Sequence, residues 1–363
     1  MRGRARTSTE DSPLGAPVDW RRRAMRSKLA GETMRAQVHS QYGGPEVLEL
    51  RRDWPDPHPD AHEVLVEVRA SAVNPVDWKV RRGNLRMLLR NHLPAIPGRD
   101  FCGVVLECGD RVTLVTPGDV VFGMCRLRGP GSHADRVCVT EDHLAHAPTR
   151  VSPLDAAAYP LAGLTAIQAI EAARVQAGQR ILVQGGAGAV GSLAVQYAVH
   201  LGAQVLATAS AANLEYLRQL GAEPIDYASE VIEQRARALD AVIDCVGGEV
   251  ERSSFASLRF GGRLITVAGP DPDGALDLRA LIKHGLGGAP RLLLQLLRGR
   301  RYRFVGTRTD HFYLSQLAQL IDQRVLEVRI DRTYSLDQLA DAHRISESGH
   351  ARGKLVIDHA EVC

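Results

Sequence analysis

Residues 181–191 read ILVQGGAGAVG, in which an apolar run precedes a glycine-rich turn of the form GxGxxG. Ile181–Val183 is typical of a buried strand, and residues 190–201 are typical of a helix. Between a strand and a helix, such glycines let the backbone approach a pyrophosphate, and the helix N-terminus attracts its charge. A glycine turn that holds no ligand is the alternative. The motif predicts a dinucleotide site that includes Gly186, Gly188, Ala189, Val190 and Gly191.

From about residue 152 onward, the segments around this turn alternate between strand and helix. Ser152 and Pro153 are typical of a helix start, because serine caps a helix and proline suits its first position. Further strands are predicted at 204–208, 241–243 and 263–267, with a helix at 213–220. This alternation predicts an α/β fold with a doubly wound parallel sheet.

The flanking parts of the chain have a different pattern. Short strands separated by turns, such as 64–68 and 101–107, fill residues 35–150 and predict a mostly β region. Mixed structure returns after about residue 323. There, residues 335–338 form a capping box that opens a last helix, and residues 354–357 are a final predicted strand.

Length and composition set limits on the class of protein. The chain has 363 residues, which suggests two domains of roughly 100–200 residues each. No apolar run approaches the roughly 20 residues that a membrane-spanning helix needs. The six cysteines include no CxxC pair, so a structural zinc lobe is not expected. We interpret them as reduced thiols in a cytoplasmic protein.

The net charge of +3 is unevenly distributed. Residues 1–28 carry a charge of +5 and the remaining residues carry −2, which argues against a nucleic-acid partner for the folded part. Residues 1–33 lack hydrophobic periodicity and are predicted to be a disordered basic tail. An over-extended start and a transit peptide are both open interpretations of this tail. The ordered pattern is expected to begin at Met34.

The residues after the second predicted strand indicate which dinucleotide binds. An NAD site usually has an acidic residue there, which holds the ribose 2′-hydroxyl group. Here the strand ends in Ala209 and Ser210, and no acid is present. Ser210 and Asn213 can donate hydrogen bonds to a 2′-phosphate, although neither is cationic. The sequence therefore predicts NADPH as the cofactor.

Several further motifs accompany the glycine turn. They are Tyr42–Leu48 (YGGPEVL), Asn74–Asp77 (NPVD), Pro97–Asp100 (PGRD), Pro160–Ala166 (PLAGLTA), Ile225–Tyr227 (IDY) and Arg352–Lys354 (RGK). With them, the chain resembles the medium-chain dehydrogenase/reductase superfamily from Met34 to about Ile357. Within that superfamily it is most similar to the zinc-independent quinone oxidoreductase and enone reductase branch.

The resemblance implies a two-domain architecture. A GroES-like β domain would be formed by both chain ends, residues 34–157 and 323–363. A Rossmann domain would be inserted between them at residues 158–322. The resemblance also implies further cofactor-binding residues. Tyr227 would lie near the adenosine phosphate, Thr165 near the nicotinamide, and Val246 and Ala268 against the nicotinamide half.

The resemblance to the zinc-independent branch also implies that no catalytic metal is bound. Zinc-dependent members of the superfamily hold the metal with a cysteine and a Gly-His-Glu run. This chain has Asn74-Pro75 in the first region and Gly98-Arg99-Asp100 in the second. Hydride transfer without a Lewis acid suits an activated acceptor, so the expected substrates are quinones and α,β-unsaturated carbonyl compounds.

Three residues near the first of these regions are the candidate catalytic groups. Lys79 could donate a hydrogen bond to the enolate oxygen, although a surface lysine is the alternative. Asn74 could orient the substrate or nicotinamide, or simply form a turn. Asp77 could act as an acid, but a bracing role in the loop is favoured. His133 could line the pocket, but a structural or surface histidine is favoured.

The predicted function is NADPH-dependent reduction of quinones or activated C=C bonds by a homodimer. Two alternatives stay open at this point. One is a trans-acting enoyl reductase in a biosynthetic pathway. The other is a protein that binds NADPH without turnover, as a structural component or sensor, and that would not need Lys79.

Overall fold

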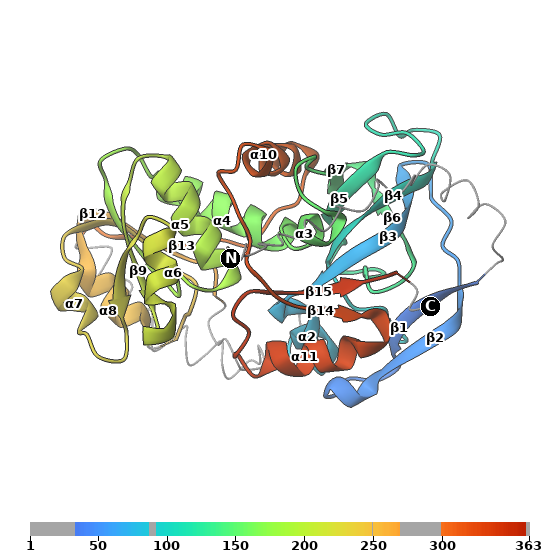
Figure 1. The fold of residues 1–363 in the computed structure, drawn as a ribbon, viewed down its shortest axis with the longest axis horizontal. Coiled ribbons are helices and arrows are strands. Elements are labelled where there is room, and N and C mark those ends of the chain that lie inside the picture. Colours follow the sequence, from blue (N-terminus) through green and yellow to red (C-terminus); the bar gives the residue numbers. More distant parts are fainter. Residues whose placement is uncertain (1–32, 87–91, 249, 269–298, 361–363) are drawn as a thin grey trace, which may run out of the picture. The chain divides into compact units, whose positions relative to one another are not determined.

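Two large sheets, a separate two-stranded hairpin and the surrounding helices make up the part of the chain that the structure describes (Figure 1). The structure is a computed structural model, and it describes residues 33–86, 92–248, 250–268 and 299–360. The predicted basic tail, residues 1–33, lies outside these ranges except for Thr33. The first strand, β1 (Thr33–His39), begins one residue before the expected start at Met34.

The α/β part is built on a six-stranded sheet in the order β10-β9-β8-β11-β12-β13, in which all neighbouring strands are parallel. Its strands are β8 (Arg180–Gln184), β9 (Gln204–Ala209), β10 (Glu223–Asp226), β11 (Leu239–Asp244), β12 (Leu258–Thr266) and β13 (Arg301–Phe304). The strand order reverses between β8 and β11. In open parallel sheets, ligands bind outside the carboxyl ends of the strands at this point.

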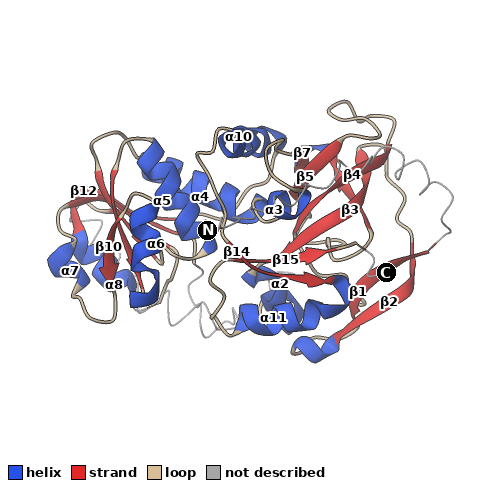
Figure 2. Ribbon diagram, viewed as in Figure 1, coloured by secondary structure: helices blue, strands red, loops and turns tan. Residues whose placement is uncertain are grey.

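Helices cover both faces of the parallel sheet, as the alternation of side chains along its strands requires (Figure 2). In β8, Ile181 and Val183 pack in one core with α4 and α5, whereas Leu182 packs in another with α7 and α8. The helices of this part are α4 (Pro160–Ala173), α5 (Ala189–His200), α6 (Leu214–Gln219), α7 (Ile232–Arg235), α8 (Val250–Ser257) and α10 (His311–Asp322).

The second sheet is formed by both ends of the chain. It has seven strands, six of them in the order β14-β15-β3-β4-β5-β7, with β6 paired to β3. The strands are β3 (Glu63–Val73), β4 (Asp100–Cys108), β5 (Val120–Met124), β6 (Arg136–Thr140), β7 (Leu144–His146), β14 (Ile330–Ser335) and β15 (Lys354–Asp358). The central junction is an antiparallel pairing of β15 with β3, in which Leu355 lies opposite Val73. The expected GroES-like architecture with an inserted Rossmann domain is confirmed.

Smaller elements complete this second part. They are a separate hairpin of β1 with β2 (Leu48–Pro55), the 3-10 turns η1 (Pro45–Val47), η2 (Glu141–His143) and η4 (Leu336–Gln338), and the helices α2 (Pro75–Arg82), α3 (Pro153–Ala157) and α11 (Leu339–Glu347). The predicted cap at Ser152 is confirmed, since its hydroxyl accepts a hydrogen bond from the Asp155 amide. The predicted domain boundaries at 157/158 and 322/323 stay predictions.

Two predicted helix starts differ from the structure. The capping box at Ser335–Gln338 opens the 3-10 turn η4, and α11 begins only at Leu339. The helix expected from residue 213 begins at Leu214, after the 3-10 turn η3 (Ala211–Asn213). In both cases, one 3-10 turn precedes the α-helix. Within the described ranges, no helix combines the length and apolar composition that crossing a membrane requires.

Candidate active site

The predicted glycine turn lies where β8 ends and α5 begins. Hydrogen bonds tie it to the neighbouring strand β9: the Gly185 amide donates to the Thr208 hydroxyl oxygen, and the Gly186 amide donates to the Thr208 carbonyl oxygen, both at 2.9 Å. Gly185, with φ of 70°, has the left-handed conformation that starts the turn. Sequence reasoning missed Gly185, because the GxGxxG pattern begins one residue later.

The glycines of the motif are required for two different reasons. A Cβ at Gly191 would lie 2.2 Å from the Gly185 carbonyl oxygen, so this position must lack a side chain for the turn to close. A Cβ at Gly188 would meet nothing nearer than that same oxygen at 3.4 Å. Packing within the described chain therefore does not require glycine at 188. The open space suits a group from outside, and Gly188 is the N-cap of the twelve-residue helix α5. The turn fits a dinucleotide pyrophosphate.

The residues expected at the nicotinamide half follow two neighbouring strands of the same sheet. Val246 comes after β11 and Ala268 after β12, so both lie at the carboxyl edge where the glycine turn follows β8. The Val246 amide is held by the Asp244 carboxylate at 2.9 Å. A Cβ at Gly185 would lie 3.0 Å from a methyl carbon of Val246, which places this side chain against the turn. The predicted residues are thus brought together at one edge.

The residues expected at the adenosine half follow β9 and β10. Asn213 donates a side-chain hydrogen bond to the Ser210 hydroxyl at 3.2 Å, and Tyr227, with 59% of its surface exposed, follows β10. The side chain of the neighbouring Asp226 is bound within the loop that follows β10. Its carboxylate accepts hydrogen bonds from the Ala228 amide at 3.0 Å and from the Ser229 hydroxyl at 2.9 Å.

A buried network joins the second sheet to the first helix of the Rossmann part. The Asp100 carboxylate accepts hydrogen bonds from the Leu161 amide and the Asn74 side-chain amide, both at 2.9 Å. The Lys354 ammonium donates to Asp100 at 3.0 Å and to the Asn74 side-chain oxygen at 2.6 Å. Asn74 therefore uses both ends of its amide inside the protein, which favours a positioning role over direct contact with substrate.

Asp77 braces the loop before α2, as favoured from the sequence. Its carboxylate accepts a hydrogen bond from the Asn74 backbone amide at 2.7 Å. Burial raises the pKa of Asp77 to about 7 against the opposing effect of this hydrogen bond, and the nearby Asp100 carboxylate adds to the rise. Asp77 also lines a cavity of about 30 Å³ together with Arg99 and His39. That volume suits one or two water molecules.

Lys79 lies one helical position beyond Trp78 on α2. Its ammonium group is 5.4 Å from the centre of the Trp78 ring, and its side chain is half-buried. It does not line the small cavity beside Asp77. The structure therefore places the Lys79 ammonium group next to an indole ring.

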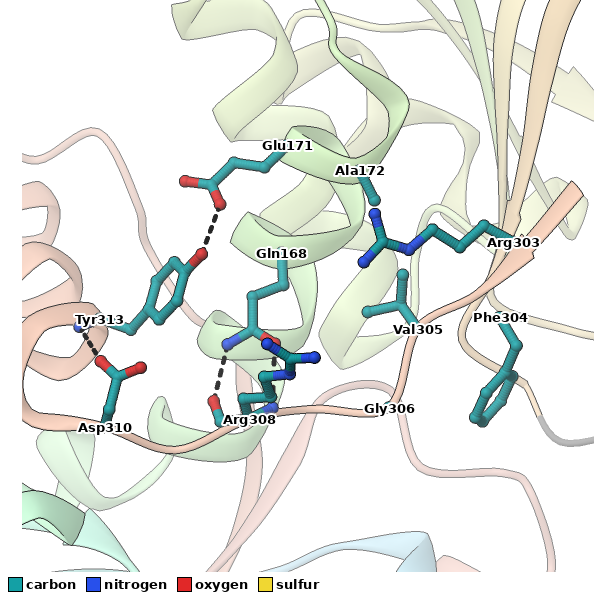
Figure 3. A pocket seen from close by; sticks show the side chains of 10 residues that line it. All are labelled: Gln168, Glu171, Ala172, Arg303, Phe304, Val305, Gly306, Arg308, Asp310 and Tyr313. Atoms are coloured by element: carbon teal, nitrogen blue, oxygen red, sulfur yellow. Dashed lines mark hydrogen bonds between the residues drawn. The ribbon is translucent and has the colours of Figure 1, made fainter. Parts of the chain in front are cut away.

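Thr165 lies in the second turn of α4, where its hydroxyl donates to the Leu161 carbonyl oxygen at 2.6 Å and lies 2.5 Å from the Thr307 hydroxyl. One turn later, the Gln168 side chain forms two hydrogen bonds with the Arg308 backbone. It donates to the carbonyl oxygen at 2.7 Å and accepts from the amide at 2.9 Å. Figure 3 shows these two hydrogen bonds among the residues that line a polar cavity, whose volume is about 320 Å³. The segment after β13 is thereby held against α4.

Buried histidines lie behind the small cavity. The Ser71 hydroxyl lies 2.8 Å from both His133 Nδ1 and His359 Nε2, and all three residues are buried. His133 also packs against Gly98 of the cavity wall, where a Cβ would lie 2.7 Å from the ring. Burial lowers the pKa of both His133 and His359 to about 3. The structural interpretation of His133 is therefore confirmed.

Comparisons with known proteins agree with this arrangement. Residues 60–149 match the family of alcohol dehydrogenase GroES-like domains, and residues 220–357 match the family of zinc-binding dehydrogenases. The chain is 34% identical to the 2-methylene-furan-3-one reductase of Solanum lycopersicum over 336 residues, covering 89% of this chain and 79% of that protein. It is 33% identical to the chloroplastic NADPH-dependent alkenal/one oxidoreductase of Arabidopsis thaliana, with the same coverage.

A solved structure supports the same relationship. The quinone oxidoreductase from Coxiella burnetii is 34% identical, with a TM-score of 0.79, covering 90% of this chain and 100% of that one. The chain belongs to the quinone oxidoreductase branch of the medium-chain dehydrogenase/reductase superfamily. Within the described part of this oxidoreductase, no three His, Cys, Asp or Glu side chains converge to hold a metal ion. The absence of a catalytic metal stays a prediction.

Sequence reasoning missed part of the oxidoreductase's site. Asp100 and Lys354 stand in quoted motifs, but their pairing across 254 residues has no local signal. The one hint is a lysine that opens an apolar strand, since a buried lysine needs a carboxylate partner. Thr208, whose hydroxyl donates to the Gln184 side-chain oxygen at 2.9 Å, was assigned only to a strand.

Proposed function

We propose that this protein is an NADPH-dependent reductase of quinones or of C=C bonds conjugated to a carbonyl group. The observation that carries the proposal is the glycine turn at the carboxyl ends of β8 and β9, with Ser210 and Asn213 in place of an acid. The names of its relatives, which include alkenal/one and quinone oxidoreductases, support the substrate class.

The chain's own residues would bind and orient the two reactants. The turn at Gly185–Gly191 would hold the pyrophosphate, and Val246 and Ala268 would contact the nicotinamide half. When bound, NADPH supplies the hydride. As the hydride reaches the β-carbon, negative charge develops on the carbonyl oxygen of the acceptor. We assign Lys79 as the donor to that oxygen, and Asn74 and Asp77 as the residues that keep α2 in place.

The decisive experiment measures NADPH oxidation with quinones, enones and enoyl thioesters, alongside NADPH binding. Turnover of quinones or enones supports the proposal. Preference for enoyl thioesters would favour the trans-acting enoyl reductase, and tight binding without any turnover would favour a structural protein or sensor. Exhaustive chelation should leave turnover unchanged, because hydride transfer is proposed to proceed without a metal. Loss of activity restored by zinc would contradict this.

The cofactor preference has its own test. In the unmodified protein, NADPH should bind more tightly than NADH, as measured by fluorescence titration. Ser210→Asp should reverse this order, because its carboxylate would repel a 2′-phosphate and accept a hydrogen bond from a 2′-hydroxyl. Equal affinities of the unmodified protein for NADPH and NADH would contradict the predicted preference for NADPH. We further infer a cytoplasmic homodimer, which light scattering and cell fractionation would test.

A further inference from the structure

At the adenosine end of the predicted cofactor site, the residues between β9 and α6 include hydrogen-bond donors but no cation. Ser210 and Asn213, which follow β9, are uncharged. A 2′-phosphate carries negative charge, and a charged donor binds it more strongly than a neutral one. Any cation at this end must therefore come from another part of the chain.

Tyr216, in the first turn of α6, joins α6 to the glycine-turn helix α5. It is three residues beyond Asn213, the N-cap of α6. Its hydroxyl lies within hydrogen-bonding reach of Ser192, in the first turns of α5. The Tyr216 ring therefore spans the two helices whose N-termini lie beside the predicted phosphate sites.

The guanidinium carbon of Arg329 lies over this ring, 5.2 Å from its centre. Arg329 belongs to the segment between α10 and β14, which is fixed at two points. Gln196 of α5 donates to the Glu327 carbonyl at 2.9 Å and accepts from the Glu327 amide at 2.8 Å. The Arg329 carbonyl accepts from the Lys354 amide at 2.8 Å. The segment between α10 and β14 thus places a cation beside α5 and α6.

The donor groups of Arg329 are available to a ligand. Among the described residues, its guanidinium makes no hydrogen bond or ion pair, and its side chain is exposed. Two acids of this region are engaged elsewhere: Glu215 pairs with Arg218 at 3.0 Å, and Asp226 binds its own loop. The Glu327 carboxylate also lies near Tyr216, and within the described ranges no ion pair joins it to Arg329. A guanidinium group that lies over an aromatic ring can still donate N–H hydrogen bonds, and its fork of donors can bind a phosphate at two points.

We propose that Arg329 binds a phosphate group of the dinucleotide cofactor, and that the 2′-phosphate of NADPH is its target. The inference deepens the proposed function and rests on it. Arg329 would supply the cation that the residues after β9 lack, so that cofactor choice depends on a residue outside the Rossmann strands and helices.

The test compares the cofactor affinities of the full-length apo protein and its Arg329→Gln variant by calorimetry. NADPH affinity should fall roughly 10- to 100-fold, as expected for loss of a charge-assisted hydrogen bond, while NADH affinity stays within about twofold. Equal losses for both dinucleotides would overturn the assignment to the 2′-phosphate, because the pyrophosphate is the only phosphate group that NADH and NADPH share. Unchanged affinities for both would overturn the inference.

Two further variants keep the test decisive. Arg332→Gln removes an exposed arginine from the neighbouring strand β14 and should leave both affinities unchanged. Arg329→Lys keeps the charge and should show an intermediate loss that grows with salt concentration, because screening weakens a point charge. If the Gln variant misfolds by thermal melting, the Lys variant decides. Failure of the unmodified protein to bind NADPH would instead contradict the proposed function.

Discussion

Lys79 is the residue on which the proposed chemistry most depends. Lys79→Met keeps the side-chain length and removes the charge, so kcat and kcat/KM for enones should fall together by about 10²–10³-fold. Quinones accept hydride more readily and should lose less. Because methionine has a similar length, packing damage should be small and the melting temperature should change little. An unchanged enone rate would mean that Lys79 is only a surface residue.

At the same scale, neighbouring residues of one motif have separate tasks. Asn74 and Asp77 were both candidate catalytic groups, and the structure uses both in hydrogen bonds that hold the start of α2. The capping relation between them was accessible from the sequence, since an N-cap and a carboxylate three residues later form a local pair. The Asn74 contacts with Asp100 and Lys354 were not, because those partners lie far along the chain.

At the scale of elements, two glycines of the turn should respond differently to the same substitution. Gly191→Ala places a methyl group 2.2 Å from the Gly185 carbonyl oxygen and should cost about 1–3 kcal/mol of unfolding free energy as well as cofactor binding. Gly188→Ala meets no such clash and should change stability by less than about 1 kcal/mol. It should nonetheless weaken NADPH binding strongly, because its methyl group occupies the ligand's space.

Denaturant titrations and dinucleotide binding to the two purified variants would check this pair. Equal losses of unfolding free energy in both variants would contradict the conclusion that a methyl group fits at Gly188 without a clash. Normal cofactor binding by the Gly188→Ala variant would show that the pyrophosphate does not approach this position.

The buried histidines that link β3 to the C-terminal end of β15 should make the fold sensitive to acid. His343 Nδ1 faces the Arg81 guanidinium at 3.1 Å and must accept its hydrogen bond, so this ring is also neutral. For His133, the folded-state pKa is about 3 against an ordinary value of 6.5. Below pH 6.5, the unfolded chain binds a proton that the folded protein does not, so stability falls as the pH decreases towards 3.

Between pH 7 and pH 5, His133 should account for a stability loss of about 2 kcal/mol. Asp77, with a pKa raised to about 7, acts in the opposite direction, since its protonated folded form gains stability as the pH falls. Comparing the unmodified protein with His133→Gln cancels the contribution of Asp77. Urea titrations at both pH values should show the variant losing about 2 kcal/mol less. Identical losses would contradict the buried, neutral state of His133.

At the scale of the whole molecule, the pair formed by Asp100 and Lys354 joins both chain ends to the first helix of the Rossmann part. Their side chains are 0% and 3% exposed. Lys354→Met would leave the Asp100 carboxylate buried without its ammonium partner and should cost about 3–5 kcal/mol of unfolding free energy. The double variant Asp100→Asn/Lys354→Met should lose less than the sum of the two single losses, because neither charge then stays unpaired. Additive losses would show that the pair is not coupled.

Features that depend on neighbours within one turn or one strand could be predicted from the amino-acid sequence. These are the glycine turn between β8 and α5, the alternation that builds a parallel sheet, the caps at Ser152 and Ser335, and the missing acid after β9. Which charges pair, which histidines stay neutral and where Arg329 lies could be seen only in the folded chain. Burial and ion pairing arise between segments that are 62 to 254 residues apart in these examples, and such packing leaves no local pattern in the chain.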